Sequence, residues 1–316
     1  MDEQRKVQLT GHSTFIVSLP RAWAERHGIG RGSALYVGED EGGNLLLSPR
    51  KAERKETEYT LEATKGGDLT LQRIISCYVA GASTIVIKGE GAGASAEEAR
   101  RRLSGLEIVE EEKDQIKLRI IDFGDELDVD KLIEREFKVT HKMLKLTASV
   151  FDGNLSAADE VKEREKDVDR LYLLLLRRFV VRPSMKPGGM FKVLAAKVIE
   201  RIGDHTEHMC RMGRKVVPNK HAANAIEKAA EAYSLIVRGF LEKTGAGKEP
   251  QKMAVEIENE RAQWMSKASK NKRDSDTIQS VFDECTRIIK YSRDLSELGM
   301  NLMAMEGGLE GLQKSK

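Results

Sequence analysis

Five acidic side chains in two segments have the spacing of metal ligands. The segment VKEREKDVD contains Glu165 and Asp169, and the segment ERIGDHTEH contains Glu200, Asp204 and Glu207. Residues four apart lie on one face of a helix, so each segment presents a pair of neighbouring carboxylates. Two such pairs facing each other across a helical seam would offer four carboxylates to one hard cation or to iron.

The two segments differ in the helix face that carries the acids. At about 100° per residue, Glu165 and Asp169 project among the apolar residues of their helix. The acids of the second segment project opposite its apolar side, which alone is typical of solvated surface and of ion pairs such as Glu207 with Arg211. A carboxylate on a packing face must be protonated, pair with a cation or bind a metal, because an unpaired buried charge is costly. A salt bridge to a neighbouring helix and a metal site are therefore the two alternatives for the first pair.

Two histidines in the second segment have different expected roles. His205 projects toward the apolar side of its helix and is expected to be a hydrogen-bonded structural residue. His208 lies one turn beyond Asp204, where it could serve as an outer ligand. The sequence leaves the role of His208 open.

The elements that position these residues are helices arranged as a repeat. From Leu127 onward the long segments have a helical period, and a shift of ninety residues aligns VIERIGDHTEHM with IIKYSRDLSELG. We therefore expect tandem three-helix bundles at about 127–217 and 218–306. In the second copy Lys290 replaces Glu200, and VEIENERAQW offers glutamates but has Ala262 where the register requires an acid. This predicts one intact cation site in the first repeat and a degenerate site in the second.

Two smaller regions precede the helical half. Residues 1–50 alternate with period two and contain a short helix beginning at SLPRAW, which indicates a small β unit with a hairpin turn at DEGGN. Residues 51–126 are predicted to form strand, helix, strand, helix and hairpin, an α/β module. The fold class is thus multidomain and mainly α. GEGAGA has Ala94 in place of the last glycine of a dinucleotide-binding loop, which disfavours nucleotide binding, and TGAGKE is interpreted as a linker.

Composition limits the classes of function. The 316 residues are 33% charged, but the formal net charge is only +2, so any contact with nucleic acid must be local. Three widely spaced cysteines show no zinc spacing, which favours reduced structural thiols. The longest apolar run is too short to span a bilayer, so we expect a cytoplasmic protein without membrane insertion.

The two acidic segments and the repeat resemble the PhoU family of phosphate-uptake regulators. Members consist of two three-helix repeats that bind metal through paired E-x-x-x-D signatures. The resemblance implies metal ligation by Glu165, Asp169, Glu200 and Asp204, with Glu207 adjacent. The ion would be divalent or trivalent, and iron, manganese, zinc and magnesium all remain open.

The N-terminal segment RKVQLTGHSTFIVSLPRAWAERHGIGRGSALYV is similar to the SpoVT/AbrB swapped-hairpin domain. That resemblance implies a homodimer in which two chains interleave their strands, with Arg5, Lys6 and Arg21 contacting DNA phosphates. Where related domains often carry arginines, this chain has Ala24 and Glu25, and residues 1–50 hold six basic and six acidic side chains. Phosphate attraction is therefore weak for one copy.

The resemblances together imply a regulator of phosphate uptake that acts by binding and not by catalysis. The leading hypothesis is a DNA-binding transcriptional regulator with a metal-binding sensor domain. The alternative is a dimeric adaptor that does not bind DNA and docks on a phosphate transporter of the ABC type, a kinase or another signalling partner. A di-iron enzyme is disfavoured because its bundle normally requires Glu-x-x-His pairs, which the helical half lacks.

Overall fold

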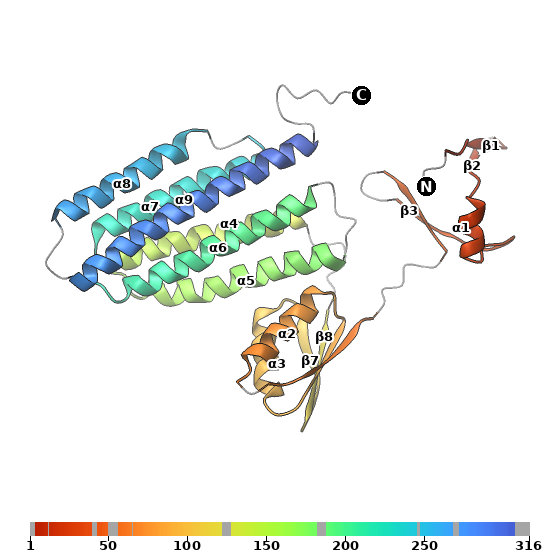
Figure 1. Ribbon diagram of the computed structural model, residues 1–316, viewed down its shortest axis with the longest axis horizontal. Helices are drawn as coiled ribbons and strands as arrows, with labels where there is room; N and C mark the ends of the chain where they lie inside the picture. The colour runs from red at the N-terminus through yellow and green to blue at the C-terminus, as the bar shows by residue number, and fades with distance from the viewer. Residues whose placement is uncertain are drawn as a thin grey trace. The chain divides into compact units, whose positions relative to one another are not determined.

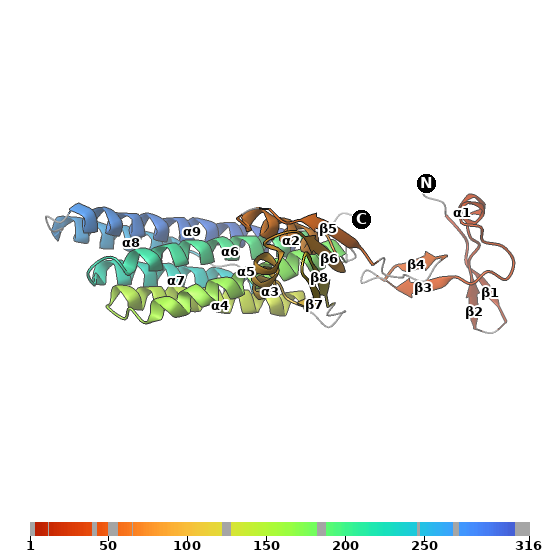
Figure 2. The ribbon, with the colours of Figure 1, turned by 90° about the horizontal axis from the view of Figure 1, so that it is seen from below.

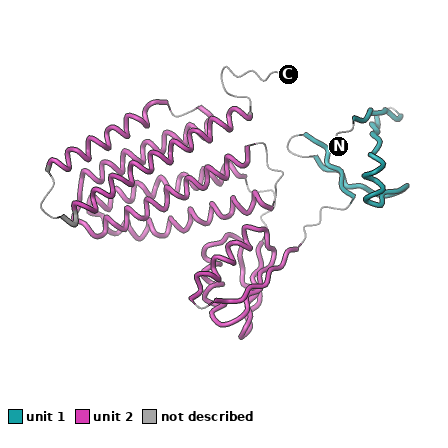
Figure 3. The backbone as a smooth tube through the Cα atoms, in the orientation of Figure 1, with its two compact units in different colours: residues 1–55 teal, residues 56–316 magenta. Residues whose placement is uncertain are grey.

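The computed structural model describes residues 4–11, 13–39, 43–49, 56–64, 66–121, 128–181, 188–244, 247–267 and 272–306. It divides into two compact units, residues 1–55 and 56–316 (Figure 3). The domain boundaries predicted at residues 50 and 126 lie outside the described residues. Across the described helices, none combines the length and the hydropathy required to cross a membrane.

The first unit consists of two short hairpins and a helix. Its elements are β1 (Gln8–Thr10), β2 (Thr14–Ile16), α1 (Arg21–Arg26), β3 (Tyr36–Glu39) and β4 (Leu45–Ser48). β1 pairs with β2 and β3 with β4, both antiparallel. Pro20 precedes α1 as its N-cap, and Gly28, with φ of +64°, follows its C-cap. A positive φ is readily adopted by glycine, which explains the helix end predicted at this residue.

The first unit has no core of its own among the residues described. None of their side chains is buried, and Phe15 and Leu45 are 75% and 70% exposed. Other large apolar side chains of the four strands are exposed as well: Leu9, Ile16, Tyr36, Val37, Leu46 and Leu47. Exposed apolar surface and open strand edges of this kind favour association.

The second unit begins with a four-stranded α/β module. Its elements are β5 (Glu58–Glu62), α2 (Asp68–Val79), β6 (Thr84–Lys88), α3 (Ala92–Arg102), β7 (Leu106–Glu112) and β8 (Gln115–Ile120). The sheet order is β5-β6-β8-β7, with β5 parallel to β6 and the other pairs antiparallel. Buried side chains of both helices, including Ile74 and Ala96, pack with strand residues such as Ile85 and Leu118 in one core. The predicted succession of strands and helices is confirmed.

Six long helices complete the second unit. They are α4 (Val129–Phe151), α5 (Ala157–Val181), α6 (Gly189–Gly213), α7 (Lys220–Glu242), α8 (Glu249–Lys267) and α9 (Lys272–Glu306). α4 to α6 form the first three-helix repeat and α7 to α9 the second, as predicted (Figure 1). The repeats lie side by side, with α4 against α7 and α6 against α9 (Figure 2). One hydrophobic core extends through both, from Leu132 to Leu302.

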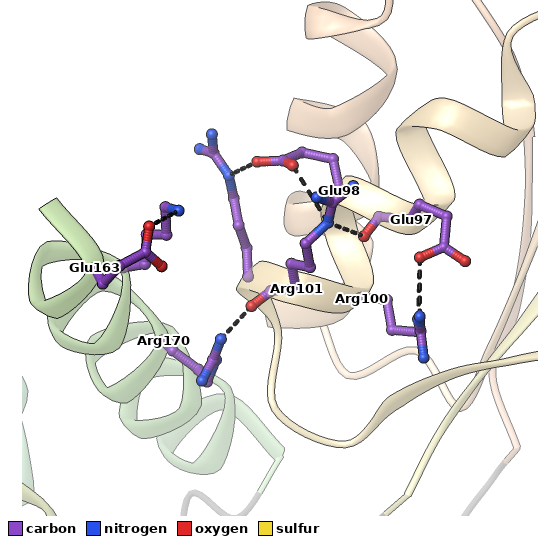
Figure 4. Close-up of polar contacts among 8 residues, drawn as sticks. Glu97, Glu98, Arg100, Arg101, Glu163 and Arg170 are labelled. Carbon is purple, nitrogen blue, oxygen red and sulfur yellow. Dashed lines mark hydrogen bonds and ion pairs between the residues drawn. The ribbon is translucent and has the colours of Figure 1, made fainter. Parts of the chain in front are cut away.

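Helix α5 joins the bundle to the α/β module. The Arg177 guanidinium donates hydrogen bonds to the carbonyl oxygens of Tyr78 and Ala82, the latter at 2.8 Å, and lies 4.8 Å from the centre of the Tyr78 ring. Arg170 donates to the carbonyl oxygen of Arg101 at the end of α3 (Figure 4). Arg170 thus holds the last turn of α3 against α5, and Arg177 holds the end of α2.

Candidate metal centre and nucleic-acid interface

Three of the predicted ligands meet between α5 and α6. Glu165, Asp169 and Asp204 each offer one carboxylate oxygen, and these three oxygens lie within 4.8 Å of one another. Glu165 and Asp169 are one turn apart on α5, and α6 packs against α5 and brings Asp204 to them. We call these three residues the carboxylate group.

The other two predicted ligands make ion pairs. A Glu200 carboxylate oxygen lies 2.5 Å from Lys197 Nζ, and a Glu207 oxygen lies 3.3 Å from the Arg211 guanidinium. The prediction of a solvated stripe is wrong for Glu200, which is only 8% exposed. Helix α6 packs against α4, α5 and α9, so it is covered on more sides than its apolar pattern suggests. Asp204 is exposed, as predicted.

The environment of the carboxylate group disfavours its fully ionised form. The pKa of Asp169 is raised to about 7, first by burial and then by the neighbouring charges of Glu165, Glu200 and Asp204, while the Arg102 charge lowers it. Burial also raises the pKa values of Glu165 and Asp204. A proton or a cation at Asp169 is therefore favoured near neutral pH.

A buried glutamate behind this group was missed by the sequence analysis. Glu136 of α4 is fully buried, and neither carboxylate oxygen has a hydrogen-bond partner among the described residues. Burial raises its pKa well above the ordinary value, and the charges of Glu200 and Asp169 add to that shift. A helical projection of 133–151 could have found it, because Glu136 shares a face with Ile133 and Thr140.

These residues fit a hard metal ion. All donors are carboxylate oxygens, the ligand type that suits magnesium and manganese and also serves iron, whereas zinc prefers nitrogen and sulfur. The unpartnered oxygens of Glu136 and the raised pKa of Asp169 both indicate that this region has too few cations for its carboxylates. Glu165, Asp169 and Asp204 would hold the ion, and their carboxylates would supply the negative charge that it requires.

In the second repeat the corresponding acids are paired. Glu256 lies against Lys228, Glu258 lies 3.7 Å from Arg261, and Glu260 lies 2.8 Å from His221 Nδ1. Lys290 and Asp294 are exposed on α9. Each of these three α8 glutamates thus has a basic partner, and the position of Glu200 carries a lysine.

The two histidines of α6 are both hydrogen-bonded. His205 Nδ1 lies 2.6 Å from a carboxylate oxygen of Glu284 on α9, and its ring centre lies 5.3 Å from that of Tyr291. The structural role predicted for His205 is confirmed. His208 Nδ1 lies 3.1 Å from Arg211, on the exposed side of the helix.

The three residues predicted to contact DNA phosphates lie in the first unit, and they differ in exposure and in their hydrogen-bond partners. Lys6 is exposed, whereas Arg5 lies 3.4 Å from the Ser18 hydroxyl and is only partly exposed. The Arg21 guanidinium forms an ion pair with Glu25 at 2.7 Å, although both side chains are largely exposed. Glu25 stands where related domains often carry a basic residue, so it reduces the positive charge of this helix.

Models of known families match the N-terminal part of the chain and the first helical repeat. A model of the PhoU domain matches residues 133–212, which covers nearly all of α4 to α6 and includes the carboxylate group. A second model, described as antidote-toxin recognition MazE, bacterial antitoxin, matches residues 8–55. No curated protein matches the chain. The two resemblances predicted from the sequence are confirmed.

Proposed function

We propose that this chain, which joins a MazE/AbrB-like N-terminal domain to a PhoU domain, is a cytoplasmic transcriptional regulator of phosphate uptake and homeostasis. In this proposal the PhoU domain binds a metal ion, and the N-terminal domain forms a homodimer that binds operator DNA. The protein acts by binding and not by catalysis. The observation that carries the proposal is the carboxylate group of Glu165, Asp169 and Asp204 inside the matched domain.

DNA binding is supported by the basic residues of the first unit. Two of them, Arg5 and Lys6, precede β1, and the third, Arg21, is the first residue of α1. Two copies in a dimer would double their number. Each phosphate contact releases a counterion when the protein binds DNA. Changing these residues to alanine should therefore weaken binding to any DNA sequence. The slope of log K against log salt should fall by about one unit per lost contact in each protomer.

The test of this proposal is a salt series with the full chain and its own promoter DNA. The proposal expects retarded DNA at low salt, with a steep salt dependence that becomes shallower in the triple variant. Lys252→Ala serves as the control, because Lys252 makes the same kind of exposed ion pair on α8, with Glu249. A wild-type chain that leaves promoter DNA unbound at low salt would refute the proposed role in transcription.

A second candidate is favoured by the pairing of Arg21 with Glu25. This ion pair removes one of the three expected phosphate contacts, and residues 1–50 have no excess of positive charge. The N-terminal unit would then serve only to form dimers, while the PhoU domain docks on a phosphate transporter of the ABC type or on a signalling kinase. The salt series separates the candidates, because the adaptor predicts a dimer that does not bind DNA at any salt concentration.

A further inference from the structure

A mixed-charge cavity lies at the junction of the α/β module and the bundle. Its volume is about 240 Å³, and its walls come from α3, α5 and α6. Six charged side chains line it: Arg102, Lys162, Glu165, Lys166, Asp169 and Glu207. Two of these, Glu165 and Asp169, also belong to the carboxylate group, so the cavity opens directly beside the candidate metal position.

The three cations of the cavity retain donors for a ligand. Arg102 uses its Nε–H to bind Glu98 at 2.6 Å, and a guanidinium has four further N–H donors. Lys162 has no ion pair among the residues that the structure describes, and Lys166 has one, with Glu163 at 2.7 Å. Arg102 is held at this position because Arg170 of α5 binds the carbonyl oxygen of the preceding residue, Arg101 (Figure 4).

The charge of this cavity depends on whether a metal is bound. When ionised, the carboxylates of Glu165, Asp169 and Glu207 offset the three cations, and Asp204 leaves one net negative charge beside the cavity. A divalent ion at the carboxylate group makes that balance more positive by two charges. The same site would therefore bind anions more favourably with metal than without it.

The buried Glu136 is an independent sign that the carboxylate group takes a cation. Its two oxygens have no hydrogen-bond partner among the described residues, and its side chain lies within electrostatic range of Asp169. Lys197 lowers the pKa of Glu136 but leaves it well above the ordinary value, so a cation at Asp169 would further compensate this buried carboxyl.

We propose that the metal-loaded cavity binds a tetrahedral oxyanion of the phosphate type, held by Arg102 from the α/β module and by Lys162 and Lys166 from α5. The inference rests on the metal site of the proposed function and adds a ligand to it. An arginine fork and lysine charges beside a bound cation are the groups that recognise phosphate oxygens. Because Arg102 and the lysines come from different parts of the second unit, the anion would link the α/β module to the bundle.

The test is calorimetric titration of inorganic phosphate into the full chain, loaded with manganese or treated with chelator. We expect binding to the loaded protein and at least about tenfold weaker binding to the chelated protein. Arg102→Gln should weaken phosphate binding by about tenfold, the loss expected for one charge-assisted contact, with manganese content unchanged. Arg100→Gln is the matched control, because Arg100 lies on the same helix and pairs with Glu97, but does not line the cavity.

The outcomes separate this inference from the function on which it rests. Manganese binding without phosphate binding would overturn the oxyanion site and leave the metal site intact, whereas a chain that binds no metal would overturn both. Equal loss in Arg100→Gln and Arg102→Gln, or equal affinity with and without manganese, would also overturn the inference. Glycerol 3-phosphate is titrated in parallel. Tighter binding of the free anion identifies phosphate itself as the ligand, and tighter binding of the ester identifies a phosphorylated molecule.

Discussion

Asp169 has the most strongly raised pKa of the three residues in the carboxylate group. Its carboxyl lies in the carboxylate group, and its pKa is raised from 3.8 to about 7, mainly by burial. Since the folded state holds this proton to a higher pH than the unfolded state, the contribution of Asp169 to the stability of the metal-free protein falls as the pH rises from about 4 to about 7. Above that range the loss is complete and remains constant.

The variant Asp169→Asn should remove this pH dependence. In chelator at pH 8 we expect the variant to be more stable than wild type by about 1 to 3 kcal/mol, and at pH 4 the two should be equal. Urea unfolding at several pH values measures the difference. Asp167→Asn on the same helix changes only a partly exposed ion pair with Arg170, so it should alter stability by less than about 1 kcal/mol. Parallel stability curves for wild type and Asp169→Asn would contradict the assignment.

At the residue scale, the sequence predicted acidic residues that come together but not which other residues surround them. The i, i+4 spacing and the packing-face position of Glu165 and Asp169 follow from helical geometry alone. The burial of Glu200 could not be predicted, because it depends on which helices pack around α6, whereas its ion pair with Lys197 is an i, i+3 contact within the helix. Arg102 was missed for a similar reason, since it comes from a different part of the unit, sixty residues earlier in the chain.

At the scale of elements, α5 has two functions. One face carries two of the three carboxylates, and its C-terminal half fastens the α/β module through Arg177. The order of strands and helices was predictable because periodicity and turn residues mark it locally. The docking of α2 and α3 on α5 could not be predicted, because it depends on hydrogen bonds between side chains and carbonyl groups far apart in the sequence.

The variant Arg177→Gln tests this junction. It removes the donor for the Tyr78 and Ala82 carbonyl groups and the contact with the Tyr78 ring. We expect a loss of about 1 to 3 kcal/mol in stability and faster amide hydrogen exchange at the end of α2. Lys138→Gln on α4, which breaks an exposed ion pair with Glu134, should cost less than about 0.5 kcal/mol. Unchanged exchange at the end of α2 in Arg177→Gln would show that the junction does not depend on this residue.

At the scale of the whole molecule, the exposed apolar strands of the first unit predict a dimer. Phe15 and Leu45 would lie in the shared core of two interleaved chains, so Phe15→Asp combined with Leu45→Asp should produce a monomer. Sedimentation of the full chain measures the change. The control is Val217→Asp, because Val217 is exposed to a similar extent, 67%, in the helical half. A double variant that sediments as wild type would place the dimer contact elsewhere.

The metal content of the purified full chain tests the central claim most directly. The account predicts that wild-type protein offered magnesium, manganese, iron or zinc in turn retains at least one of them. Asp204→Asn should abolish this binding, because Asp204 completes the carboxylate group. Asp294→Asn, the equivalent change in the second repeat one turn from Lys290, should leave the content unchanged. Elemental analysis showing no retained metal in the wild type, or equal content in wild type and Asp204→Asn, would contradict the account.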